Sequence, residues 1–214
     1  MPAIQTRKPT RQRARAVAGP VAMEFLQALS AIQGQIEVTT REGASVALAE
    51  GLARGIGLIE ACATRGRKLM FVGNGGSAAI ASHQAVDYWK NGGVKAVAFN
   101  DPSFLKCLSN DYGYERVFAE PIQGFADSGD LLIAISSSGR SANILQAAEA
   151  ARQRGCEVLT LSGFDATNPL RTQGSLNFYI PSHGYGVVEV THLTLLHAML
   201  DELMARRKAA APPA

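Results

Sequence analysis

Two short loops rich in glycine and serine have the composition of phosphate-binding loops. The first is Val72-Gly73-Asn74-Gly75-Gly76-Ser77 and the second is Ile135-Ser136-Ser137-Ser138-Gly139-Arg140-Ser141; each follows an apolar run and precedes a helix-like segment. The N-terminus of a helix exposes unpaired N–H groups and partial positive charge, which favour an anion. Glycine lets the backbone approach such a ligand closely, and serine hydroxyls add rotatable donors. Together the two loops predict a phosphorylated ligand.

Ordinary strand-to-helix turns are the alternative interpretation, because turns and helix caps also use glycine and serine. The first loop alone is equally compatible with both interpretations. The second loop places four serines within residues 136–141. That is more hydroxyls than capping requires, so this loop favours the anion site.

Histidines and carboxylates beyond the loops could supply acid–base chemistry or hold a divalent metal. His83 and Asp87 are four residues apart on one helix face, and Glu189, His192 and His197 share a later helix. Spacing alone favours Glu189 with His192, at i and i+3, over Glu189 with His197. The alternative is that these histidines are satisfied core residues beside leucines.

The elements that must position these residues follow from the apolar pattern. Residues 20–66 read as two helices that precede any strand, with one stripe at Phe25, Leu26, Leu29 and Ile32 and another at Val46, Leu48, Leu52, Ile56 and Ile59. Strands are then expected at residues 68–72, 95–99, 131–135, 157–161 and 176–180. Helices are expected at residues 77–91, 141–154 and 187–207, with short helices within 102–124.

This alternation predicts an α/β fold, a buried parallel sheet with helices on both faces. Ligands of such folds bind at the carboxyl ends of the strands, where both loops lie. We expect a single domain over residues 20–208, a basic disordered tail over residues 1–19 and a frayed end over residues 209–214.

Charge and composition limit the kinds of partner that the protein can be expected to bind. The formal net charge is +3, but Arg7, Lys8, Arg11, Arg13 and Arg15 carry five positive charges ahead of the first acidic residue, Glu24. No aromatic residues interleave with them, so a solvated tail is favoured over nucleic-acid binding. The sequence has no apolar run long enough to cross a membrane and no signal-like start, and its three cysteines are expected to be reduced core thiols. We therefore expect a cytoplasmic protein with no membrane partner.

The two loops and the histidines together resemble a known protein family. The run Gly73-Asn74-Gly75-Gly76-Ser77 with His83, the run from Ser136 to Asn143 and the later His197 look like the sugar isomerase (SIS) family, and more narrowly like its phosphoheptose isomerases. The likeness extends from Glu24 to Leu203 and includes Asn100-Asp101 and the run from Asn110 to Tyr114. It implies a three-layer, doubly wound, flavodoxin-like sheet with an N-terminal helical pair.

The resemblance also implies roles for individual residues. It assigns the phosphate to Ser77, Ser136, Ser137, Ser138 and Ser141, and the rest of the sugar phosphate to Asn74, Gly75, Gly76, Asp101 and Glu189. It implies a zinc site made of His83, Asp87, Glu189 and His197. The chain departs from the family in having Asp87 where glutamate is usual and Glu189 where glutamine is usual. Asn91 replaces an arginine, and the loop over residues 185–189 is one residue shorter.

The implied reaction is an aldose–ketose isomerisation of sedoheptulose 7-phosphate to D-glycero-D-manno-heptose 7-phosphate through an enediol, with Asp87 as base and His197 as acid. A non-catalytic SIS protein that binds a phosphosugar or a partner, like the replication-initiator-associating proteins, and an isomerase of another sugar phosphate are the alternatives. Family members are typically tetramers with active sites between subunits. The apolar stripes of the first two helices also predict a homo-oligomer, because they need a covering surface.

Overall fold

The computed structural model of the 214-residue chain describes residues 19–210. The expected basic tail, apart from its last residue, and residues 211–214 lie outside the described residues. Seven helices are present in the described part: α1 (Pro20–Ile32), α2 (Leu48–Thr64), α3 (Gly76–Lys90), α4 (Pro102–Tyr112), α5 (Ala119–Phe125), α6 (Ala142–Gln153) and α7 (Tyr185–Ala210). Short 3₁₀ helices span Gln33–Gln35, Tyr114–Arg116 and Pro169–Thr172.

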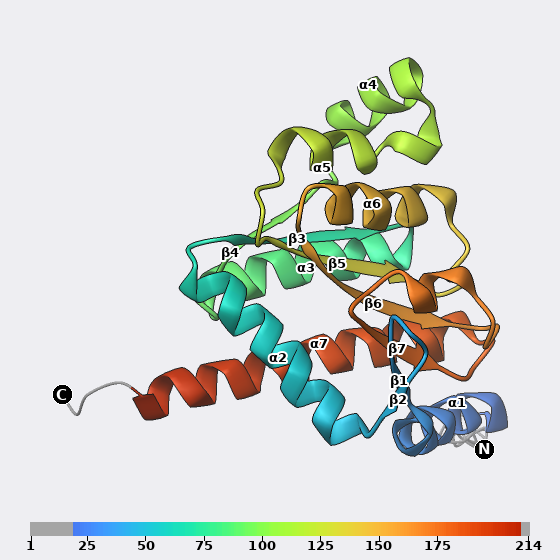
Figure 1. Cartoon of the computed structure of the whole chain (residues 1–214). Coiled ribbons are helices and arrows are strands. Elements are labelled where there is room, and N and C mark those ends of the chain that lie inside the picture. The colour runs from blue at the N-terminus through green and yellow to red at the C-terminus, as the bar shows by residue number, and fades with distance from the viewer. Residues whose placement is uncertain (1–18, 211–214) are drawn as a thin grey trace, which may run out of the picture.

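One seven-stranded sheet forms the middle layer, in the order β2-β1-β7-β6-β5-β3-β4 (Figure 1). Its strands are β1 (Glu37–Thr40), β2 (Ser45–Val46), β3 (Lys68–Gly73), β4 (Lys95–Ala98), β5 (Leu131–Ser136), β6 (Glu157–Gly163) and β7 (Leu176–Ile180). The strands from β3 to β7 are parallel, and β5 and β7 are buried along their whole length. Continuous apolar runs are typical of such strands because helices cover both faces.

The predicted α/β fold is confirmed, and the strand order explains where a ligand can bind. The chain passes from β3 outward to β4 and then returns to the other side of β3 to form β5. This reversal leaves a crevice at the carboxyl ends of β3 and β5. The two glycine- and serine-rich loops follow these two adjacent strands.

Two apolar clusters join the helices to the sheet. One cluster packs α2, α3 and α7 on one face, through residues such as Ile59, Tyr88 and Leu196. The other packs α4, α5 and α6 on the opposite face, through residues such as Ile122 and Ala147. The result is the three-layer arrangement visible in Figure 1.

The expectation that two helices precede any strand was wrong. Between α1 and α2 the chain forms a hairpin of β1 and β2, which pairs antiparallel with β7 and extends the sheet. Val46, which was expected on a helical stripe, lies in β2. The β-branched run Val38-Thr39-Thr40 favours a strand, and Gly43 adopts a φ of 83° in the turn. The hairpin was missed because strands of four and two residues are too short to show up as a break in the helical spacing of the apolar residues on either side.

Two of the three cysteines are buried as expected, and one is exposed. Cys62 and Cys156 are buried, and burial raises the pKa of each thiol to about 11, whereas Cys107 on α4 is exposed. All three are free. The expectation of core thiols is therefore wrong for Cys107, because the outer face of the short helix α4 has no layer above it.

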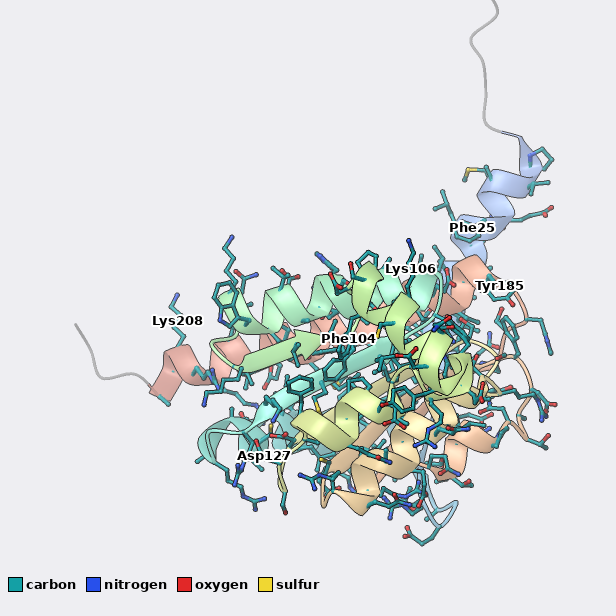
Figure 2. All side chains as sticks on the ribbon, turned by 90° about the horizontal axis from the view of Figure 1, so that it is seen from above. Phe25, Phe104, Lys106, Asp127, Tyr185 and Lys208 are labelled. Atoms are coloured by element: carbon teal, nitrogen blue, oxygen red, sulfur yellow. The ribbon has the colours of Figure 1, made fainter. Side chains whose placement is uncertain are left out.

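Helix α1 leaves much of its apolar side chain surface uncovered. Val21, Met23, Phe25 and Leu26 are exposed, while Ile32 at the end of the helix is buried. Figure 2 shows α1 extending from the body of the protein, with Phe25 near the start of α7 at Tyr185. The predicted oligomer would cover this stripe, and it stays a prediction. No helix among residues 19–210 combines the length and apolar character that a membrane span needs.

Candidate active site

The first loop makes the turn between β3 and α3. A Cβ atom added to Gly73 would lie 2.5 Å from the Ser77 carbonyl oxygen, and Gly75 adopts a φ of 53°. Both positions therefore require glycine: the first for space and the second for its backbone conformation. The turn presents the N-terminus of α3, beginning at Gly76, to the crevice.

The second loop joins β5 to α6 and is held by its own hydroxyls. The Gly139 N–H donates to Ser136 Oγ at 3.1 Å, and the Ser136 and Ser141 hydroxyls lie 3.4 Å apart. Ser137 is buried, and its Oγ has no hydrogen-bond partner among the described residues. A buried hydroxyl is normally paired, so this one is available to a ligand oxygen.

The two loops enclose a cavity of about 270 Å³. Predicted substrate-binding residues line it together with Ile135 and Tyr185; they are Asn74, Gly75, Gly76, Ser77, Ser136, Ser137, Ser138, Ser141 and Glu189. Asp101 does not line this cavity. Its carboxylate accepts the Phe104 N–H at 2.8 Å and so caps the first turn of α4.

A cluster of two histidines and a carboxylate lies further along α3 and α7. Asp87 Oδ2 is 3.3 Å from His83 Nε2 and 3.9 Å from His197 Nδ1. The two imidazole rings meet edge to face with centroids 5.4 Å apart. The Tyr88 hydroxyl donates to the Leu196 carbonyl at 3.0 Å, and this bond ties the two helices together beside the cluster.

These three side chains have the donor set of a zinc site. One ligand atom from each of His83, Asp87 and His197 lies within 4.8 Å of the others. Imidazole nitrogen and carboxylate oxygen are the zinc ligands that catalytic sites combine, with a fourth position left for water or substrate. Three of the four residues that the family resemblance implies for zinc therefore fit that metal.

Glu189 does not join this cluster in the structure. It precedes His197 by eight residues in the continuous helix α7, which is a rise of about 12 Å along the axis. Its carboxylate lies instead over Gly76, where an added Cβ would clash with it. Glu189 therefore places a negative charge in the serine-lined cavity at the N-terminus of α3.

His192 is a core histidine, so the pairing with Glu189 that spacing favoured is wrong. Its side chain is fully buried, and its Nε2 lies 3.1 Å from the Ser162 carbonyl oxygen. Burial lowers the pKa of His192 to about 4, so the ring is neutral near pH 7. Spacing along the chain could not show whether His192 points toward the cavity or toward the sheet, because it does not say which face of α7 meets the sheet.

Three polar residues near the site were missed by reasoning from residue types. Gln84 is buried and donates its Nε2 N–H to His197 Nε2 at 3.1 Å. Asn143 pairs with Asn74, and the Tyr114 hydroxyl donates to Asn74. The only sequence signal for Asn143 and Tyr114 was their presence in runs that resemble the family; Gln84 had none beyond its place after His83.

Comparisons with known proteins show the family of this chain. The family model described as SIS domain matches residues 37–163, which include both loops, His83 and Asp87. A phosphoheptose isomerase of Geobacter sulfurreducens is 37% identical over 142 residues, 64% of this chain and 75% of that protein. One from Photorhabdus laumondii subsp. laumondii is 39% identical over 142 residues, 64% of this chain and 73% of that protein.

Solved structures extend the likeness to most of the fold. The structure of phosphoheptose isomerase GmhA from Neisseria gonorrhoeae superposes with a TM-score of 0.73 at 31% identity, covering 86% of this chain and 97% of that chain. A phosphoheptose isomerase from Francisella tularensis gives the same TM-score at 24% identity, covering 87% of this chain and 95% of that chain, a likeness of fold. On its sequence and its structure, this chain belongs to the SIS domain family, among relatives that are phosphoheptose isomerases.

Proposed function

We propose that this protein is a phosphosugar isomerase that converts sedoheptulose 7-phosphate to D-glycero-D-manno-heptose 7-phosphate. One observation carries the proposal: the helices α3 and α7 both begin at the serine-lined cavity and both contribute to the cluster of His83, Asp87 and His197. The chain therefore combines an anion site with acid–base groups on the same pair of helices. The names of its relatives support the choice of substrate.

The cavity is the phosphate end of the site in this proposal. Its serine hydroxyls and the N-terminus of α3 supply donors and partial positive charge. The Ser137 hydroxyl has no hydrogen-bond partner among the described residues, and this supports the assignment because a phosphate oxygen would complete its hydrogen bonding.

The proton transfers belong to Asp87 and His197. The Gln84 side-chain N–H is a donor, so His197 Nε2 accepts and its Nδ1, the nitrogen facing Asp87, carries the proton. Asp87 then removes the proton from the carbon beside the substrate carbonyl, and His197 protonates the carbonyl oxygen. This yields an enediol. Asp87 then returns its proton to the former carbonyl carbon while His197 takes back a proton from the hydroxyl on the adjacent carbon, which becomes the aldehyde and restores both groups.

We also propose that His83, Asp87 and His197 can hold a zinc ion, in which case His197 Nδ1 carries no proton and would serve as a ligand instead of as the acid. When bound, zinc would supply Lewis acidity toward the substrate oxygens. A fourth ligand from Glu189 would come from a second copy of the chain, because the Glu189 carboxylate of the same copy lies over Gly76 and not at the cluster of His83, Asp87 and His197. A site completed between copies in a tetramer satisfies this requirement, and the exposed apolar stripe of α1 supports an assembly.

The decisive experiment incubates the purified protein with sedoheptulose 7-phosphate, with and without added zinc. We expect formation of the heptose 7-phosphate, and loss of turnover in His197→Ala. Bound sugar phosphate without turnover under either condition would contradict the isomerase and favour a non-catalytic SIS protein. Turnover that survives in His197→Ala would remove the proposed acid.

Mixing two inactive variants tests the shared site. Glu189→Ala and His197→Ala damage different parts of the chain. Co-refolded or co-expressed together, they should regain activity if one copy's cavity works with another copy's cluster. Light scattering on the same samples should report a tetramer; a monomer with full activity would refute the shared site.

A further inference from the structure

The side chains of Asn74 and Asn143 form a reciprocal amide pair at the edge of the serine-lined cavity. Asn74 Nδ2 donates to Asn143 Oδ1 at 2.9 Å, and Asn143 Nδ2 donates to Asn74 Oδ1 at 2.9 Å. Asn143 is buried at the start of α6, whereas Asn74 lines the cavity. The pair thus links the loops after β3 and β5 through side chains.

A third group reaches the same amide from a distant part of the chain. The Tyr114 hydroxyl, in the 3₁₀ helix after α4, donates to Asn74 Oδ1 at 3.0 Å. The Tyr114 side chain is 56% exposed, so this bond does not serve to satisfy a buried hydroxyl. It holds the amide of Asn74 from the solvent side.

Counting hydrogen bonds shows what Asn74 still offers to a ligand. A side-chain amide has two acceptor positions on its oxygen and two N–H donors on its nitrogen. The oxygen of Asn74 already accepts from Asn143 and from Tyr114, so its acceptor capacity is filled. The nitrogen uses one N–H toward Asn143, and the second has no acceptor among residues 19–210.

We infer that Tyr114 is a positioning residue that, together with Asn143, fixes Asn74 as a hydrogen-bond donor to an oxygen of the bound sugar phosphate. The inference rests on the proposed function for the identity of the ligand. It assigns a hydrogen-bond direction to the site: Asn74 recognises a carbonyl or hydroxyl oxygen of the sugar by donating to it. It also links the segment after α4, which does not line the cavity, to substrate binding.

The test is the single-atom change Tyr114→Phe. Removing one neutral hydrogen bond should raise KM for sedoheptulose 7-phosphate, or its Kd by calorimetry, about 2- to 10-fold. The inhibition constant of inorganic phosphate should stay unchanged, because phosphate binds to the serines. Tyr112→Phe is the matched control: Tyr112 is the last residue of α4, two positions before Tyr114, is 50% exposed, and its hydroxyl makes no hydrogen bond within the described residues.

A double-mutant cycle separates positioning from a structural role. In an Asn74→Ala background, Tyr114→Phe should have no further effect on KM or Kd, because the amide it holds is gone. Asn74→Asp, which replaces the free donor by an acceptor, should weaken binding more than Tyr114→Phe does. Equal effects of Tyr114→Phe in both backgrounds, or an equal shift in phosphate inhibition, would overturn the inference.

These outcomes are distinct from failure of the proposed function. Binding of the sugar phosphate without turnover would refute the isomerase while leaving the cycle measurable by calorimetry. A protein that binds no sugar phosphate would refute both. As a readout that needs no ligand, the NMR signals of the Asn74 side-chain amide, assigned by their loss in Asn74→Ala, should shift in Tyr114→Phe and not in Tyr112→Phe. Unshifted signals would contradict the contact itself.

Discussion

Acid should destabilise this protein through His192. The ring is fully buried on α7, and its Nε2 lies 3.1 Å from the Ser162 carbonyl oxygen, which can only accept. Nε2 therefore carries the proton of the neutral ring, and Nδ1 has no partner among the described residues. Protonation would bury a positive charge and a second N–H without an acceptor. This cost explains why the pKa of His192 is lowered to about 4.

The size of the effect follows from the difference between the folded and unfolded states. The unfolded ring titrates near pH 6.5 and the folded ring near pH 4. Above pH 6.5 neither state binds this proton, so the full stability is present. As the pH falls from 6.5 toward 4, only the unfolded state is protonated. The free energy of unfolding should then drop by about 1.4 kcal/mol at pH 5.5 and about 2.5 kcal/mol at pH 4.5.

Urea unfolding at pH 7.5, 5.5 and 4.5 measures this loss at one fixed protein concentration. The variant His192→Gln keeps an N–H donor for Ser162 and does not titrate. The difference in unfolding free energy between the two proteins isolates His192 from the carboxylates, whose contributions cancel. That difference should shrink or reverse in favour of the variant at low pH. A difference that is constant across the three pH values would refute the reasoning.

Three further predictions concern the site and the turn that builds it. Gly73→Ala should lower the free energy of unfolding in urea by about 2 to 3 kcal/mol, because the new Cβ meets the backbone of the first turn of α3. The control Gly57→Ala, with open space around its Cβ on α2, should raise it by about 0.5 to 1 kcal/mol. Equal effects would contradict the turn argument. Glu189→Gln removes a carboxylate from the serine-lined cavity and should tighten inhibition by inorganic phosphate about 5-fold at low salt, with a smaller gain at high salt; weaker inhibition would show that the charge assists binding. Asp87→Asn and His197→Ala should each lower kcat about 100- to 10,000-fold with little change in Tm, since both side chains are partly exposed; a large fall in Tm would make the kinetic loss structural.

The overall architecture could be predicted from the sequence because it depends on local apolar patterns. The runs that form β3 and β5 are apolar throughout, and the amphipathic segments between strands have helical spacing. The hairpin of β1 and β2 was missed for a related reason. It is short, and β1 is stabilised by pairing with β7, which is far away in the sequence.

The candidate site was predictable only in part. The serine-lined cavity is built from contiguous loops, so most of the residues that line it could be named from their composition and from the family resemblance. The other contacts depend on which helix faces meet. The bond between Tyr88 and Leu196 joins α3 to α7, and that packing decides that His197, and not His192, approaches Asp87.

The sequence by itself determined the fold class, the two glycine- and serine-rich loops and the family, because each is encoded in short stretches of chain. Only the tertiary structure decided the partners of single side chains. It put Glu189 over Gly76, buried His192 against Ser162, and brought Tyr114 to Asn74 across 40 residues of sequence. The physical reason is that the rotation of each helix about its axis is set by side-chain packing against distant elements, which spacing along the chain does not specify.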